Sequence, residues 1–100
     1  MKVQIVSETG TGSTSALVMN TNITPFNVGF GVLVTGTVNY TVEHTFADPA
    51  IGFTTWFPHP TIAALAVNAD GNYAFPVTGI RLTVNSGGGT ATLKLIQAGI

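Results

Sequence analysis

Cysteine is absent from this sequence of 100 residues, and charged residues are scarce. Without cysteine the chain forms neither disulfides nor the Cys-based zinc sites of small domains. Only 7% of its residues are charged, against about 25% in a typical soluble domain. A net charge of -1 gives little protection against association. We therefore expect a surface that is partly covered in an assembly; the alternative is a Thr-rich polar exterior that suffices by itself.

Other absences bear on the possible partners. The three cationic side chains are too few for the about six to ten phosphate contacts of an ordinary DNA interface, so nucleic-acid binding is disfavoured. No apolar run reaches the roughly 18 residues of a membrane span. The segment 1–8 alternates like a strand and lacks the apolar core of a signal peptide. We expect a complete translation product of the cytosol.

The clearest pattern is a two-residue alternation from Val32 to Phe46, which predicts a long half-buried strand. Gly36 interrupts it, and we expect a bulge or a sharp bend there, where the strand can cross from one sheet to another. The side chains predicted to share the inner face are Val32, Val34, Val38, Tyr40, Val42, His44 and Phe46.

The last third of the chain predicts a β-hairpin. Apolar residues alternate over 80–84 and again over 91–95, on either side of the turn Ser86–Gly89. Asn68–Asn72 has the composition of a turn, and the Gly/Ser/Thr-rich segment 7–15 predicts an exposed, flexible loop. No helix-length amphipathic window occurs. The sequence thus predicts one all-β domain over residues 1–100, a compact antiparallel β-sandwich or jelly-roll-like fold.

Residues with catalytic chemistry are few and poorly placed for a shared site. Glu43 and His44 are neighbours on a strand, so their side chains point to opposite faces. We expect His44 to be a hydrogen-bonded histidine at the edge of the core, and His59 to lie in a surface loop between Pro58 and Pro60. Two histidines without cysteine give no metal-ligand spacing. The sequence predicts no catalytic, cofactor or metal site, and a non-enzymatic protein.

An aromatic stretch containing Phe53, Trp56 and Phe57 is the remaining candidate. These rings either close one end of the sandwich or form an anchor at an interface, where aromatic residues concentrate binding energy. Alternation along an extended segment directs Trp56 inward and Phe57 outward. The candidate interface consists of Trp56, Phe57, Pro58, His59 and Pro60.

Two segments, TVNYTVEHTFADPAIGFTTWFPHP (37–60) and NADGNYAFPVTGIRLTVNSGGGTATLKLIQAG (68–99), resemble small structural proteins of tailed-phage virions, of the head decoration (cement) type. The resemblance covers roughly Gly36 to Gly99. It implies a protein made in the host cytoplasm that binds the major capsid protein on the outer capsid surface, stabilises the head and associates with itself as a homotrimer. It supplies no catalytic residues and no map of contacts.

Two other virion roles stay open. A tail or fibre module would bind a host-surface glycan or receptor, and Trp56 or Tyr73 could then stack on a sugar ring. A head–tail adaptor would join two parts of the particle.

Overall fold

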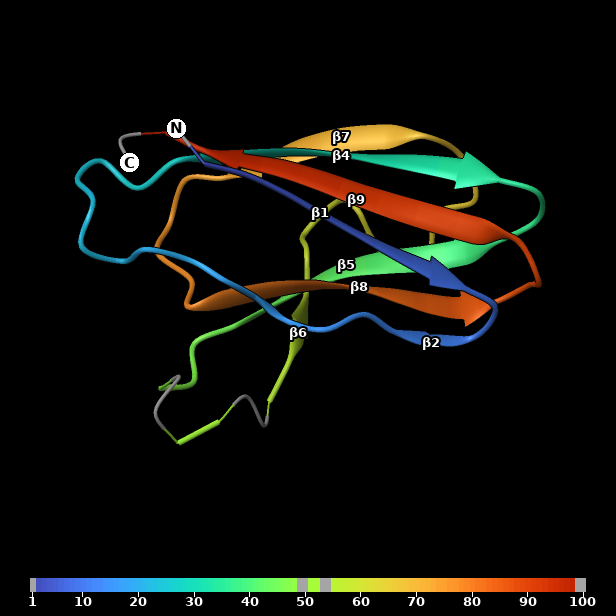
Figure 1. Ribbon diagram of the computed structural model, residues 1–100, viewed down its shortest axis with the longest axis horizontal. Helices are drawn as coiled ribbons and strands as arrows, with labels where there is room; N and C mark the ends of the chain where they lie inside the picture. The colour runs from blue at the N-terminus through green and yellow to red at the C-terminus, as the bar shows by residue number, and fades with distance from the viewer. Residues whose placement is uncertain (1, 49–50, 53–54, 99–100) are drawn as a thin grey trace.

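The computed structural model describes residues 2–48, 51–52 and 55–98, and the regular elements in these residues are all β-strands. The part of the chain that the structure describes contains no helix long and apolar enough to span a membrane. The strands form two antiparallel sheets (Figure 1). Sheet A has the order β1 (Lys2–Thr9), β9 (Thr90–Gln97), β4 (Val28–Thr35) and β7 (Ala69–Tyr73). Sheet B has the order β2 (Gly12–Ser13), β8 (Gly79–Ser86), β5 (Asn39–Thr45) and β6 (Phe57–Pro58), and β3 (Leu17–Val18) also pairs with β8.

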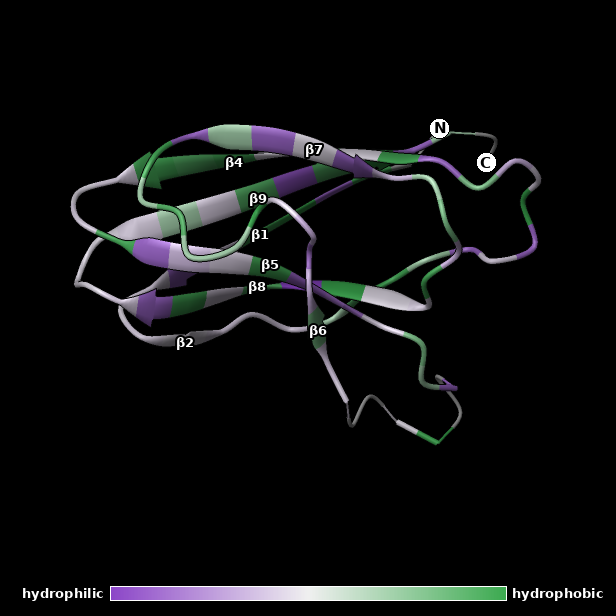
Figure 2. Ribbon diagram, turned by 180° about the vertical axis from the view of Figure 1, so that it is seen from behind, coloured by the Kyte–Doolittle hydropathy of each residue, from purple (hydrophilic) through white to green (hydrophobic). Residues whose placement is uncertain are grey.

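A single hydrophobic core lies between the two sheets, which confirms the predicted antiparallel β-sandwich. Alternation directs one side of each long strand into this core, and Figure 2 shows the resulting apolar and polar bands along β8 and β9. The residues that are almost fully buried include Tyr40, Val42, Tyr73, Ile80, Leu82, Leu93 and Leu95.

The long strand predicted over 32–46 is divided between the two sheets. β4 belongs to sheet A and β5 to sheet B, and the chain crosses between them at Gly36, whose φ is 80°. The bend predicted at this glycine is therefore confirmed. The predicted inner face continues across the bend, since Val32, Val38 and Tyr40 are all buried.

The hairpin predicted around the glycine turn is wrong. β8 pairs with β5 in sheet B, whereas β9 pairs with β1 and β4 in sheet A, so the turn joins two sheets instead of two neighbouring strands. The crossing from β8 to β9 requires Gly87 and Gly89 because it packs closely against the crossing from β4 to β5 at Gly36. A Cβ at Gly87 would overlap the carbonyl oxygen of Thr37, and a Cβ at Gly89 would overlap that of Thr35.

Two further predicted loops are strands in part. β1 runs to Thr9, and the chain then crosses at Gly10 into β2, inside the segment predicted as a loop over 7–15. The amide of Gly10 donates to the carbonyl of Gly89 over 3.0 Å. The turn predicted at 68–72 is replaced by β7, in which Gly71 lies opposite Phe30. A Cβ there would come within 3.0 Å of the Phe30 ring, so the glycine allows close packing instead of a turn.

Candidate functional site

Three exposed phenylalanines gather at the end of the sandwich remote from the glycine crossings. Phe46 directly follows β5, Phe57 lies in β6 opposite His44, and Phe75 follows β7. Their exposed fractions are 54%, 45% and 41%, in that order. Strands of both sheets end here, so residues far apart in the sequence meet at one place. We call Phe46, Phe57, Phe75 and the His44 ring beneath them the aromatic end.

The rings of the aromatic end form one continuous surface. The His44 ring centroid lies 5.3 Å from that of Phe46, 6.0 Å from that of Phe57 and 5.5 Å from that of Phe75. Phe46 in turn lies 5.7 Å from Phe57 and 6.3 Å from Phe75. These separations fall in the range of favourable aromatic pairs. Each of the three phenylalanine rings contacts its neighbours and remains partly exposed to solvent, which leaves an apolar patch on the surface.

His44 anchors this patch from inside the protein. It is buried, and its Nδ1 forms a hydrogen bond of 2.9 Å with the hydroxyl of Tyr73. Burial lowers the pKa of His44, and the nearby imidazole of His59 lowers it further. Burial also raises the pKa of Tyr73, with an added contribution from Glu43. Both shifts favour the neutral forms, and the hydrogen-bonded histidine predicted at the edge of the core is confirmed.

His59 does not lie on the surface, contrary to the prediction. It is 7% exposed, and its Nδ1 accepts hydrogen bonds from the backbone amides of Thr61 and Ile62 at 3.1 and 3.0 Å. Because this nitrogen is an acceptor, Nε2 carries the proton and donates to the carbonyl of Asn72 over 3.0 Å. The imidazole thus joins the segment after β6 to β7, a role that the neighbouring prolines in the sequence did not indicate.

The directions predicted for Trp56 and Phe57 are reversed. Phe57 stands opposite His44, and directly opposed residues point to the same side of a sheet, so Phe57 lies on the core side at its open end. Trp56 is half-buried on the outer side of sheet B, where the guanidinium carbon of Arg81 lies 4.3 Å from its ring centroid. Neither residue belongs to the core cluster.

The candidate interface is therefore brought together only in part. Phe57, Pro58 and Pro60 are exposed, Trp56 is half-buried and His59 is buried. Phe53 lies outside the described residues. The sequence interpretation missed Phe46 and Phe75 as surface residues. A signal was present in both cases, since Phe46 ends an alternating run just before Asp48 and Phe75 precedes Pro76.

Glu43 lies on the opposite face from His44, as predicted. Its Oε1 accepts hydrogen bonds from Nε of Arg81 at 2.7 Å and from the hydroxyl of Thr83 at 2.5 Å. Within the described residues, no three His, Cys, Asp or Glu side chains come together as metal ligands would. The histidines and Glu43 are thus engaged in bonds that hold strands together, and the aromatic end offers apolar contact.

In comparisons with known proteins, no family model, curated protein or solved structure matches this chain significantly.

Proposed function

We propose that this protein is a non-enzymatic structural protein that docks onto a larger protein assembly through its aromatic end. The observation that carries the proposal is the clustering of Phe46, Phe57 and Phe75, each more than two-fifths exposed, around one buried histidine. Binding energy at protein interfaces is concentrated in aromatic anchors of this kind. The rings are already fixed by mutual contact, so little conformational freedom is lost when a partner covers them.

The more specific form of the proposal is a phage head decoration protein that binds the major capsid protein. It is supported by the resemblance of segments 37–60 and 68–99 to such proteins and by the low charge of the chain. A protein that is repeated on a shell has part of its surface covered by its neighbours. A low number of charges favours such covering, because fewer charged groups lose contact with water. Virion location and self-association into trimers are predictions of the same resemblance.

A glycan-binding role finds less support in the geometry. Tyr73 is 0% exposed and cannot stack on a sugar ring. The Trp56 ring carries the Arg81 guanidinium on it and is half-buried. Docking to protein is therefore the function that we propose.

Substitution of the exposed rings tests the proposal. In Phe57→Ala and Phe75→Ala, we expect attachment to heads assembled without this protein to weaken by about 2 kcal/mol, roughly thirtyfold. Cosedimentation with such heads measures this loss, and thermal melting of the free protein should change little because both rings are partly exposed.

Val67→Ala is the matched control. Val67 is 65% exposed and precedes β7, whereas Phe75 follows it. The control should attach like the unaltered protein. Attachment of both phenylalanine variants at full affinity would contradict docking through the aromatic end.

A further inference from the structure

The outer face of sheet A is a second surface that a monomer leaves uncovered. Four of its side chains are large, apolar and about half exposed: Val3 at 51%, Ile5 at 56%, Leu33 at 50% and Ile96 at 46%. Val3 and Ile96 stand directly opposite each other on β1 and β9. On the corresponding face of sheet B, Glu43 and Arg81 form an ion pair and Ser13 bonds Thr83 over 2.8 Å. The outer face of sheet A has polar pairs of its own, Ser7 with Thr92 and Thr9 with Thr90, beside the four apolar side chains.

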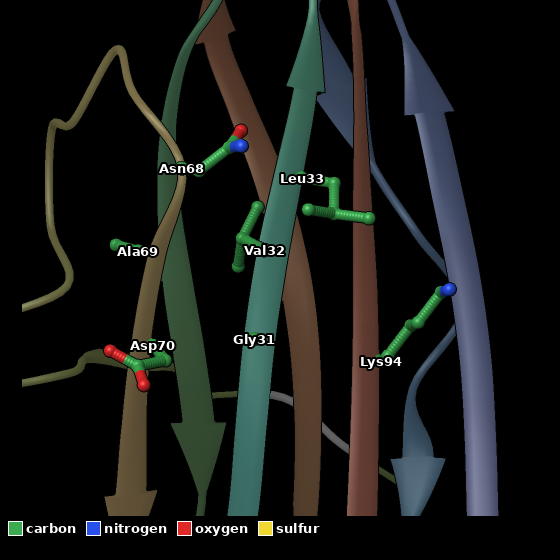
Figure 3. Close-up of a pocket in the computed structure, with 7 residues that line it drawn as sticks. All are labelled: Gly31, Val32, Leu33, Asn68, Ala69, Asp70 and Lys94. Atoms are coloured by element: carbon green, nitrogen blue, oxygen red, sulfur yellow. The ribbon is translucent and has the colours of Figure 1, made fainter.

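A hollow of about 420 Å³ lies on this face, lined by residues of β4 and β7, by Asn68 and by Lys94 on β9. Gly31 on β4 lines it and has only the carbonyl oxygen of Ala69 within 4 Å of the position of a Cβ. Lys94 on β9 and Asp70 on β7 are the direct neighbours of Gly31 on either side. Figure 3 shows these two charged side chains flanking the glycine and pointing away from each other.

Lys94 and Asp70 are exposed, and the ion pair found within the described residues is the one between Arg81 and Glu43. They lie two strands apart, about 10 Å at ordinary strand spacing. Among the side chains that the structure describes, this face therefore carries one cation and one anion, placed on the two sides of β4, and neither takes part in an ion pair. Such an arrangement is complementary to itself.

We propose that the outer face of sheet A binds a second copy of this chain about a two-fold axis parallel to β4. This axis lies midway between the two packed faces. Rotation about it places β9 of one copy over β7 of the other. It brings Lys94 of each copy over Asp70 of the other and forms two equivalent ion pairs. Leu33 lies on the axis and meets Leu33 of the second copy. Strands of the two packed sheets then run nearly parallel, as in aligned sheet packing.

The charges select this arrangement from the alternatives. A two-fold axis perpendicular to the strands at the level of Gly31 places Lys94 over Lys94 and Asp70 over Asp70, which is repulsive. Exposed ion pairs contribute little affinity by themselves. Burial of Leu33 on β4 and Ile96 on β9 supplies the affinity, and the charge pairs determine the orientation. Val3 and Ile5 lie on the edge strand β1, beyond the overlap of the two sheets.

This pairing goes beyond the proposed docking function and uses none of the residues of the aromatic end. It also differs from the homotrimer that the resemblance implies, since a closed two-fold contact gives a dimer. The two proposals fail separately, because Phe57→Ala and Phe75→Ala should still form dimers.

Charge reversal with a mixing step tests the pairing. By sedimentation equilibrium at micromolar to millimolar concentration, the unaltered chain should be a dimer in equilibrium with its monomer. Lys94→Glu and Asp70→Lys, each alone, face like charges across the axis, and we expect dimerisation about tenfold weaker or worse. An equimolar mixture of the two variants has both pairs restored in the heterodimer and should dimerise like the unaltered chain. The double variant carrying both reversals should do the same.

Thermal melting shows whether the variants are folded, and both positions are exposed, so folding should persist. A monomer of the unaltered chain at every concentration, or a trimer, overturns the proposal. So does a mixture that associates no better than either single variant, because only the exchange of Lys94 and Asp70 across the axis predicts that rescue.

Discussion

One end of the sandwich is built from glycines, and the other end is built from aromatic residues. At one end the chain crosses between the sheets three times, at Gly10, at Gly36 and over Gly87–Gly89 (Figure 1, right). Hydrogen bonds of 3.0 Å join these crossings, from the Gly10 amide to the Gly89 carbonyl and from the Gly89 amide to the Thr37 carbonyl. At the other end, large aromatic rings surround His44 and remain open to solvent.

The first end contains residues that the fold requires, and the second end contains exposed side chains that are available for binding. At the glycine crossings, backbone lies against backbone so closely that a Cβ at Gly87 or Gly89 has no space. At the aromatic end, the core is already closed by Tyr73 and His44, and the exposed rings add surface that folding does not need. We therefore expect substitutions at the first end to affect stability and those at the second to affect binding.

The largest effect should follow from Gly87→Ala. Its φ of 96° disfavours any L side chain, and the new Cβ would overlap the Thr37 carbonyl. Backbone strain and overpacking together should cost about 3 kcal/mol of unfolding free energy, measured by urea titration. Gly88→Ala is the control, since a Cβ there meets nothing within 4 Å, and it should stay within about 0.5 kcal/mol. Equal decreases in unfolding free energy for Gly87→Ala and Gly88→Ala would show that Gly87 is not closely packed against Thr37.

A smaller effect should follow from Trp56→Ala. Trp56 packs against Arg81 outside the core, so we expect the unfolding free energy to fall by about 1 kcal/mol, the range of an exposed cation–π contact. A tryptophan that closed the core would cost about 3–5 kcal/mol. Thermal and urea melts distinguish the two values, and a loss of the larger size would place Trp56 inside the sandwich.

The smallest effect should appear on acidification and should come from the aromatic end. The pKa of His44 is lowered by burial and by His59, so the unfolded chain binds the proton more readily than the folded one. The stability contributed by neutral His44 is complete above its ordinary pKa of 6.5 and is lost as the pH falls from there toward the folded value. Urea titrations at pH 8 and pH 5.5 should show a drop that is smaller in His44→Gln. An equal drop in the variant would mean that another group is responsible.

The sequence by itself determined which side of β4, β5, β8 and β9 faces the core. Two-residue alternation is a local property of the backbone, so Leu82 and Leu93 could be placed inside without knowing their neighbours. The bend at Gly36 could be predicted for the same reason, because a glycine interrupts an otherwise continuous pattern. The opposite directions of Glu43 and His44 also follow from alternation alone.

Strand partners and surface composition depended on the tertiary structure. Two alternating segments around a glycine turn have the same pattern whether the strands are neighbours in one sheet or face each other across a core. The pattern over β8 and β9 therefore predicts a hairpin that the fold does not form. His59 became buried because its ring accepts bonds from the turn that follows it and donates to β7. Phe46, Phe57 and Phe75 form one patch because the ends of β5, β6 and β7 converge. The local sequence marks where Phe46 and Phe75 leave their strands, but it does not show that these strand ends meet.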